Sequence, residues 1–212
     1  MQAEKCYICS ENASYIHIKR INYYVHDDIQ NISDQELQMI LSWIPAWRRE
    51  EALRYKHRQG QLECALSYMM LCQAISANYG IDAQPHFVIG EHGKPTLKEY
   101  PDIHFNISHC KKAIAVAVND RPIGLDVECI GRENDSLARY VLNDDELRQM
   151  EASDEPSVLF AKYWTRKEAV FKLHGTGIRD DIKNLLVNSD NIEISTIVHK
   201  EKGYALSVAI GK

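Results

Sequence analysis

The chain has 212 residues with a formal net charge of −5, a length that suits one large domain or two of about 100 residues. The mild acidity argues against a general nucleic-acid binder, which would carry a basic excess. No apolar run approaches the roughly 18 residues needed to cross a bilayer, and residues 1–14 lack the apolar core of a signal peptide, so we expect a cytoplasmic protein that binds no membrane and no nucleic acid.

The N-terminal part begins with two cysteines, a strand pattern and a helix pattern. Cys6 and Cys9 form a C-x-x-C motif without a second pair at zinc-finger spacing, so we expect reduced, packed thiols rather than a zinc site. Residues 15–25 alternate between apolar and polar side chains, which predicts one early strand. Ser33, with an acidic residue three positions later, predicts a helix that starts there and ends before Pro45.

A long helical pattern occupies residues 47–79, with Gly60 as a candidate break and Gly80 as the expected end. A turn follows at Gly93-Lys94-Pro95. Residues 103–108 and 113–118 then predict two strands, and the second is apolar on both faces, so we expect it at the centre of a sheet.

Residues 119–122 are the best place to divide the chain, into halves of residues 1–121 and 122–212. Further elements are expected in the second half: a strand at residues 123–128, a short helix near 137–140, a helix from Asn143 or Asp144, the main helix from Pro156 to Leu173 or His174 before Gly175 and Gly177, and an antiparallel strand pair at 192–198 and 204–210. Strands and helices mix without the alternation of a doubly wound sheet, so the fold class is α+β, with two related halves and a site between them as the expected arrangement.

Two acidic residues alternate with apolar ones on the strand at residues 123–128. Asp126 and Glu128 point to one face and Leu125 and Val127 to the other. Two carboxylates on one face of a buried strand repel each other and lose hydration, and a hard divalent cation between them relieves both costs. The alternative is an edge strand with both carboxylates in solvent, because exposed charges are the rule.

Glu168 and Lys172 share one face of the predicted main helix. Glu168 offers a third carboxylate to a metal, and Lys172 offers a cation to an anionic ligand. Taken alone, the two residues would more often be an ordinary surface ion pair. Together with Asp126 and Glu128, they suggest a Mg²⁺ site that holds a diphosphate.

The Ser108-His109-Cys110 segment invites a second interpretation, a nucleophile with its base. Adjacent residues of a strand point apart, so neither Ser108 nor Cys110 is placed to be activated by His109. The sequence therefore disfavours a hydrolase of that kind.

Four segments, in this order and spacing, resemble the Sfp-type 4′-phosphopantetheinyl transferases: Gly93-Lys94-Pro95, Phe105 to His109, Ile123 to Glu128 and Trp164 to Lys172. The resemblance implies transfer of phosphopantetheine from coenzyme A to a serine of an acyl or peptidyl carrier protein, with release of adenosine 3′,5′-bisphosphate. It also implies a monomer, folded as a pseudo-dimer of two similar α+β halves with coenzyme A in the cleft between them.

The resemblance assigns the reacting centre. Asp126, Glu128 and Glu168 match the family's magnesium carboxylates, and Lys172 matches its diphosphate-contacting lysine. His109 would add a donor to the phosphate oxygens, because a neutral imidazole still has one N–H. Glu168 is the favoured base for the serine, although nearby positive charge would keep its pKa low and makes water on the metal a rival.

The resemblance also assigns coenzyme A contacts. They are Ser108 with His109 at the phosphates, Gly93-Lys94-Pro95 beside the adenine, Arg48 toward the 3′-phosphate and Arg54 at a basic position of the long-helix motif. The chain departs from the family about eight positions beyond Arg54, where Gln61-Leu62-Glu63 replaces a further basic residue. Arg48, Lys56 or Arg58 are candidates to substitute for it.

Two other functions remain open at this point. One is a catalytically inactive relative that binds coenzyme A or a carrier domain, although a pure binder has no need of a full carboxylate set. The other is a metal-dependent nucleotide hydrolase with water as the nucleophile.

Overall fold

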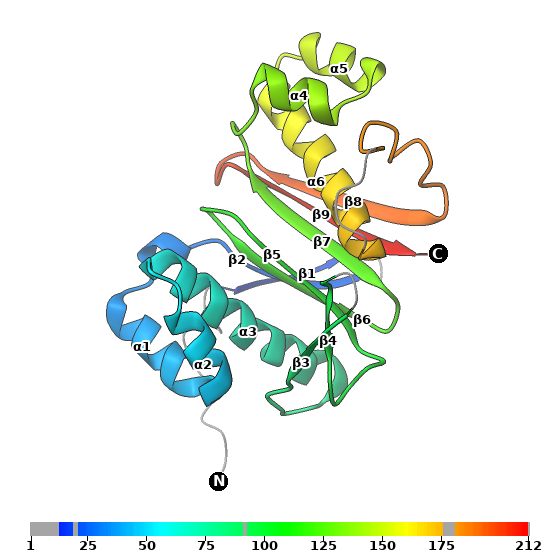
Figure 1. Ribbon diagram of the computed structural model, residues 1–212. Helices are drawn as coiled ribbons and strands as arrows, with labels where there is room; N and C mark the ends of the chain where they lie inside the picture. Colours follow the sequence, from blue (N-terminus) through cyan, green and yellow to red (C-terminus); the bar gives the residue numbers. More distant parts are fainter. Residues whose placement is uncertain (1–12, 19–20, 91–92, 176–180, 212) are drawn as a thin grey trace.

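The structure is a computed structural model that describes residues 13–18, 21–90, 93–175 and 181–211. It is built from two main sheets and a small hairpin, with helices packed against the sheets (Figure 1). The mixture of helix and strand confirms the α+β class, while the pseudo-dimeric relation of the halves stays a prediction. Within the described ranges, no helix combines the length and apolarity needed to span a bilayer.

The N-terminal sheet has four strands in the order β1, β2, β6, β5, and each neighbouring pair is antiparallel. These strands are β1 (Ala13–Ile18), β2 (Ile21–His26), β5 (His104–His109) and β6 (Ile114–Asn119). The first five residues of β6 are buried between β2 and β5, which confirms its central place. The expectation of one strand at residues 15–25 is wrong, because two paired strands share this stretch and the alternation runs on through both.

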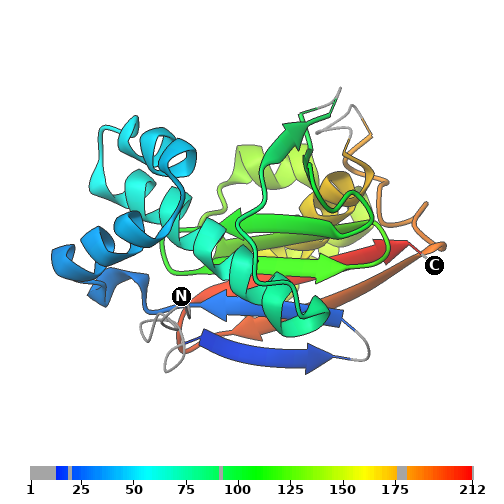
Figure 2. The same cartoon turned by 90° about the horizontal axis from the view of Figure 1, so that it is seen from below.

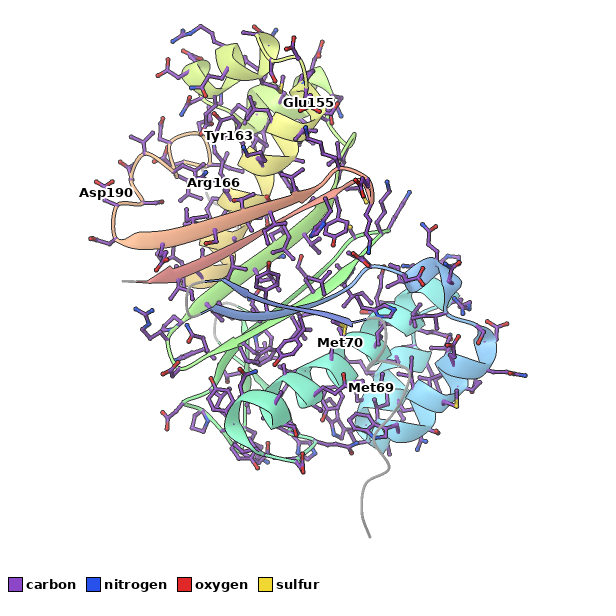
Figure 3. All side chains as sticks on the ribbon, turned by 180° about the vertical axis from the view of Figure 1, so that it is seen from behind. Met69, Met70, Glu155, Tyr163, Arg166 and Asp190 are labelled. Atoms are coloured by element: carbon purple, nitrogen blue, oxygen red, sulfur yellow. The ribbon has the colours of Figure 1, made fainter. Side chains whose placement is uncertain are left out.

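Helices cover the outer face of this sheet. They are the short 3₁₀ turn η2 (Ile29–Asn31), α1 (Asp34–Trp43), α2 (Ala46–Leu53) and α3 (Arg58–Tyr79). Ser33 forms the expected capping box with Glu36, which satisfies two backbone N–H groups at the start of α1. In the view from below, α3 crosses the strands of the N-terminal sheet (Figure 2). Met69 and Met70, buried on α3, lie on the opposite side of the sheets from Tyr163 and Arg166 (Figure 3).

The long helical pattern breaks between α2 and α3 and not at Gly60, which lies inside α3. A β-carbon at Gly60 would lie 2.7 Å from Cδ1 of Tyr55, so the glycine makes room for that ring. Gly80 ends α3 in the left-handed conformation, as expected. After α3 the chain forms the small hairpin of β3 (Phe87–Ile89) and β4 (Pro95–Leu97). Gly93, with a φ of 82°, confirms the turn that precedes β4.

The C-terminal sheet has three antiparallel strands in the order β7, β9, β8. Its elements are β7 (Ile123–Cys129), α4 (Asp135–Val141), α5 (Asp144–Glu151), α6 (Pro156–His174), β8 (Ile192–His199) and β9 (Tyr204–Gly211). All were expected close to these positions. Gly175 ends α6 in the left-handed conformation, whereas Gly177 lies outside the described residues. The α6 helix lies along β7 and β9 (Figure 1).

The two sheets meet where β5 and β7 run side by side. Both are edge strands of their own sheets, and side chains link them. The Asn106 side-chain oxygen accepts a hydrogen bond from the Leu125 N–H at 3.2 Å, and Ser108 Oγ accepts one from the Val127 N–H at 3.2 Å. Each link joins residues nineteen positions apart, so the two strands run in the same direction.

Buried cysteines occur in the cores on both sides of this junction. Cys64, Cys72 and Cys110 are buried free thiols. Cys6 and Cys9 lie outside the described residues, so their expected reduced state stays a prediction. The proposed division of the chain at residues 119–122 falls between β6 and β7 and stays a prediction.

Candidate active site

The acidic strand and the main helix pack directly against each other, and their polar residues meet. Asp126 on β7 is only 4% exposed, so the alternative of a carboxylate in solvent is wrong for this residue, although β7 is an edge strand. Leu125 and Val127 are fully buried in the core on the opposite face, as the alternation predicted. The close approach of α6 depends on Gly124, which has no side chain to hold the helix away from the strand.

Asp126, Lys172 and Ser108 form one hydrogen-bonded group. Lys172 Nζ donates to Asp126 Oδ1 at 2.6 Å and to Ser108 Oγ at 2.9 Å. Ser108 Oγ donates to Asp126 Oδ1 at 2.9 Å and accepts from the Val127 N–H. A hydroxyl has one donor and two acceptor positions, so this protein network uses all three. Ser108 therefore orients Asp126 and Lys172, and its contact with phosphates stays a prediction.

Glu168 on α6 lies beside this group in a half-buried position. The pKa of Glu168 is raised to about 7, chiefly by burial and also by the nearby Asp126 carboxylate, while Lys172 opposes both. In the protein without a bound metal, the pKa of Glu168 is therefore raised, whereas from the sequence we expected it to be low. Glu168 Oε1 and Asp126 Oδ2 are buried oxygens for which the described residues provide no hydrogen-bond partner.

Those two oxygens are the observation that tests whether a metal ion fits here. Buried carboxylate oxygens without partners are costly, and anionic oxygen is the ligand that Mg²⁺ prefers. The donors of Asp126 and Glu168 therefore fit a hard divalent cation. Among the residues that the structure describes, however, no three His, Cys, Asp or Glu side chains are grouped closely enough to hold a metal, so the three-carboxylate site stays a prediction.

Glu128 is turned toward a different partner. Arg132, four residues further on, forms an ion pair with Glu128 through Nη1. The Arg132 guanidinium also lies 6.0 Å from the centre of the Trp164 ring, close enough for a cation–π contact. The sequence interpretation missed Arg132, and its only signal was a basic residue close behind the acidic strand.

His109 ends β5 and faces α3 rather than the carboxylates of β7. Its Nδ1 lies 3.3 Å from Glu63 Oε2, and the same glutamate accepts a hydrogen bond from Gln59 at 2.9 Å through its other oxygen. Glu63 belongs to the segment in which the chain departs from the family. His109 therefore has a carboxylate beside one ring nitrogen, and its contact with phosphate stays a prediction.

Arg48 is buried in the N-terminal half. Its guanidinium forms an ion pair with Glu51 at 2.8 Å and donates to the Cys64 carbonyl at 3.0 Å. It also lies 5.2 Å from the centre of the Phe87 ring, a distance typical of cation–π contact. Arg54 is exposed at the end of α2. The 3′-phosphate roles of both arginines stay predictions.

Lys94 has a structural role that its turn motif did not reveal. Its Nζ donates to the carbonyls of Ile123 and Leu173, each at 3.0 Å, and burial lowers its pKa. Lys94 thus ties the small hairpin to the start of β7 and the last turn of α6, one residue after Lys172. A cation suits the free carbonyls at a helix C-terminus.

Comparison with known proteins agrees with this geometry. A family model described as the 4′-phosphopantetheinyl transferase superfamily matches residues 122–209. A 4′-phosphopantetheinyl transferase from Bacillus subtilis is 30% identical over 150 residues, which cover 69% of this chain and 67% of the relative. The transferase Sfp of Bacillus subtilis strain 168 is 29% identical over the same shares of the two chains. The transferase AcpT of Salmonella typhimurium is 36% identical over 96 residues, which cover 43% of this chain and 50% of the relative.

Proposed function

The chain belongs to the Sfp-type 4′-phosphopantetheinyl transferase family and is a transferase of this type, and from this premise we propose its reaction. It moves 4′-phosphopantetheine from coenzyme A to a serine of an acyl or peptidyl carrier protein, depends on Mg²⁺, and releases adenosine 3′,5′-bisphosphate. The observation that supports this most is the hydrogen-bonded group of Asp126, Lys172 and Ser108 on β7, α6 and β5, with the half-buried Glu168 beside it.

The reaction builds up negative charge, and the chain supplies groups to offset it. The serine oxygen attacks the β-phosphorus of the coenzyme A diphosphate, and the bond to the nucleotide phosphate breaks. Lys172 offers an ammonium group to the diphosphate oxygens. Mg²⁺ would be held by Asp126, Glu128 and Glu168 and, when bound, supplies Lewis-acid stabilisation of the phosphate charge.

Glu168 is the proposed base for the serine proton. A base works best when its pKa lies near the operating pH. Burial raises the pKa of Glu168 to about 7 in the protein without a metal, and a bound Mg²⁺ would lower it. Ser108 holds the side chains of Lys172 and Asp126 in position through its three hydrogen bonds. His109 would donate to a phosphate through a ring N–H.

The remaining assignments follow the family. Arg48 and Arg54 are proposed on the 3′-phosphate side of coenzyme A, and Gly93-Lys94-Pro95 beside the adenine. We propose a monomeric, cytoplasmic enzyme with the substrate between its two halves.

The test is a mass measurement on a panel of apo carrier proteins incubated with the enzyme, coenzyme A and Mg²⁺. We expect at least one carrier to gain the mass of one phosphopantetheinyl group, and a chelator to prevent the gain. No gain on any carrier would favour a protein that only binds coenzyme A or a carrier. Release of adenosine 3′,5′-bisphosphate without a carrier would favour a nucleotide hydrolase.

A further inference from the structure

Arg132 is a cation that the proposed reaction does not use, although it contacts one of the proposed metal ligands. It follows β7 closely and reaches back to the Glu128 carboxylate. The pKa of the Arg132 guanidinium is raised by this hydrogen bond, and the charge of Asp126 adds to the effect. Arg132 therefore belongs electrostatically to the carboxylate group of β7 and α6.

Arg132 and a divalent cation would be attracted to the same carboxylate. Glu128 Oε1 accepts the Arg132 hydrogen bond, and a dication bound to Glu128 would repel the guanidinium at this short range. Three carboxylates and the two cations Arg132 and Lys172 leave one uncompensated negative charge.

We propose that Arg132 is the internal counter-ion of Glu128 in the metal-free enzyme and leaves it when a divalent cation binds, so that Arg132 lowers the metal affinity of the site. This inference rests on the magnesium site of the proposed function. Its basis is the Arg132–Glu128 ion pair beside the buried oxygens of Asp126 and Glu168 that find no partner in the described part of the chain.

The surroundings of the two cations indicate that Arg132, and not Lys172, leaves its carboxylate when a metal ion binds. The Arg132 side chain is 57% exposed, and the preceding Gly131 has a φ of 91°, as in a turn. The Trp164 ring, 6.0 Å from the guanidinium, gives the arginine a second favourable contact. Lys172 is 30% exposed and is held by both Asp126 and Ser108. Release of Arg132 is therefore the smaller change.

The test measures Mg²⁺ binding to the full chain without coenzyme A or a carrier, by calorimetry. We expect the variant Arg132→Gln to bind Mg²⁺ roughly two- to fivefold more tightly than wild type, the change that a partly exposed ion pair supports. The matched control Arg139→Gln removes the same charge from an exposed position on α4 and should leave the affinity unchanged. Circular dichroism confirms that both variants are folded.

Tryptophan fluorescence gives a second readout that does not depend on activity. Because Arg132 lies beside Trp164, its departure should change the emission of wild type during the Mg²⁺ titration, and Arg132→Gln and Trp164→Phe should lose that change. If Arg132→Gln binds Mg²⁺ as tightly as wild type or more weakly, the proposed role of Arg132 is wrong, and the metal site itself is not contradicted. Absence of saturable Mg²⁺ binding in wild type would overturn the metal site and this inference together.

Discussion

Gly124 on β7 lies directly against the backbone of Ala169 on α6, so closely that a β-carbon at position 124 would be 1.9 Å from the Ala169 carbonyl oxygen. The same β-carbon would be 2.4 Å from the Leu173 nitrogen. Both neighbours are helix backbone, which cannot rotate out of the way as a side chain can. This contact sets the spacing between Asp126 on the strand and Lys172 on the helix.

The variant Gly124→Ala should therefore push α6 away from β7. We expect the free energy of unfolding to fall by about 1–3 kcal/mol or more, the usual cost of overpacking a rigid site, with transfer activity lost at temperatures where the variant is still folded. Urea unfolding measures the first effect. Gly211→Ala is the control, because a β-carbon there meets nothing within 4 Å, and equal unfolding energies for the two variants would contradict the argument.

Asp126→Asn and Glu168→Gln each remove one charge from the proposed metal site and keep the side-chain shape. We expect transfer to a carrier to fall roughly a hundredfold or more, the scale for loss of a group that stabilises developing charge, while both proteins stay folded. The measurement is the rate of carrier mass gain at saturating Mg²⁺. The control Glu193→Gln, at an exposed position of β8, should retain full activity. Near-normal turnover by Asp126→Asn or Glu168→Gln would contradict the proposed metal site.

Lys172→Ala should act on both stability and catalysis. It leaves the buried Asp126 carboxylate without its cation, so the unfolding free energy without metal should drop by about 1–3 kcal/mol. We expect a higher KM for coenzyme A and a lower kcat, because the ammonium is proposed to contact the diphosphate. Added Mg²⁺ should restore more stability to this variant than to wild type. Steady-state kinetics and thermal unfolding with and without Mg²⁺ check these outcomes, and unchanged KM would argue against the diphosphate contact.

Lys94→Met should loosen the last turn of α6. The substitution keeps an unbranched apolar side chain and removes the donor to the Ile123 and Leu173 carbonyls. Hydrogen bonds from a charged donor contribute about 1.5–3 kcal/mol, and we expect a loss of that size in urea unfolding. Lys98→Met, at an exposed position after β4, is the control and should unfold like wild type.

His26 should make the protein sensitive to acid. Burial lowers its pKa from the ordinary 6.5, and neighbouring Asp28 and Asp27 only partly oppose the shift. Neither ring nitrogen has a hydrogen-bond partner among the described residues. As the pH falls below 6.5, the unfolded chain takes up a proton that the folded His26 resists, so this contribution to stability is present above pH 6.5 and is lost below it.

The variant His26→Phe should therefore show a flatter dependence of unfolding free energy on pH between about 7 and 5. His57→Gln, which removes an exposed histidine, should keep the wild-type slope. Chemical unfolding at a series of pH values gives both slopes, and an unchanged slope in His26→Phe would show that other groups cause the acid sensitivity.

Local patterns predicted the parts of this molecule that depend on neighbours in sequence. The alternation around Asp126 predicted both its strand and its facing direction, and the capping signature at Ser33 predicted a helix start, because both depend on residues only a few positions apart. The same dependence on neighbouring residues explains why one strand was predicted at residues 15–25 instead of two. Apolar and polar residues alternate through β1 and β2 alike, so the pattern did not separate them.

Contacts between distant segments were beyond such patterns. Glu63 meets His109, and Lys94 reaches the end of α6, only because the fold brings α3, the hairpin and α6 to the same region. Gly124 did carry a signal, since an isolated glycine within a strand often marks close approach by another backbone. The direction taken by Arg132 depends on side-chain rotation, which sequence spacing does not determine.

The junction of β5 with β7 has a consequence for how this enzyme can diversify. A ladder of main-chain hydrogen bonds is nearly indifferent to mutation, because every residue except proline brings the same N–H and C=O groups. Here an amide on Asn106 and a hydroxyl on Ser108 take the place of such a ladder. These two side chains therefore help to align the two sheets, together with the apolar core that both sheets share, and variation at these positions is one route to reshaping the angle between the halves.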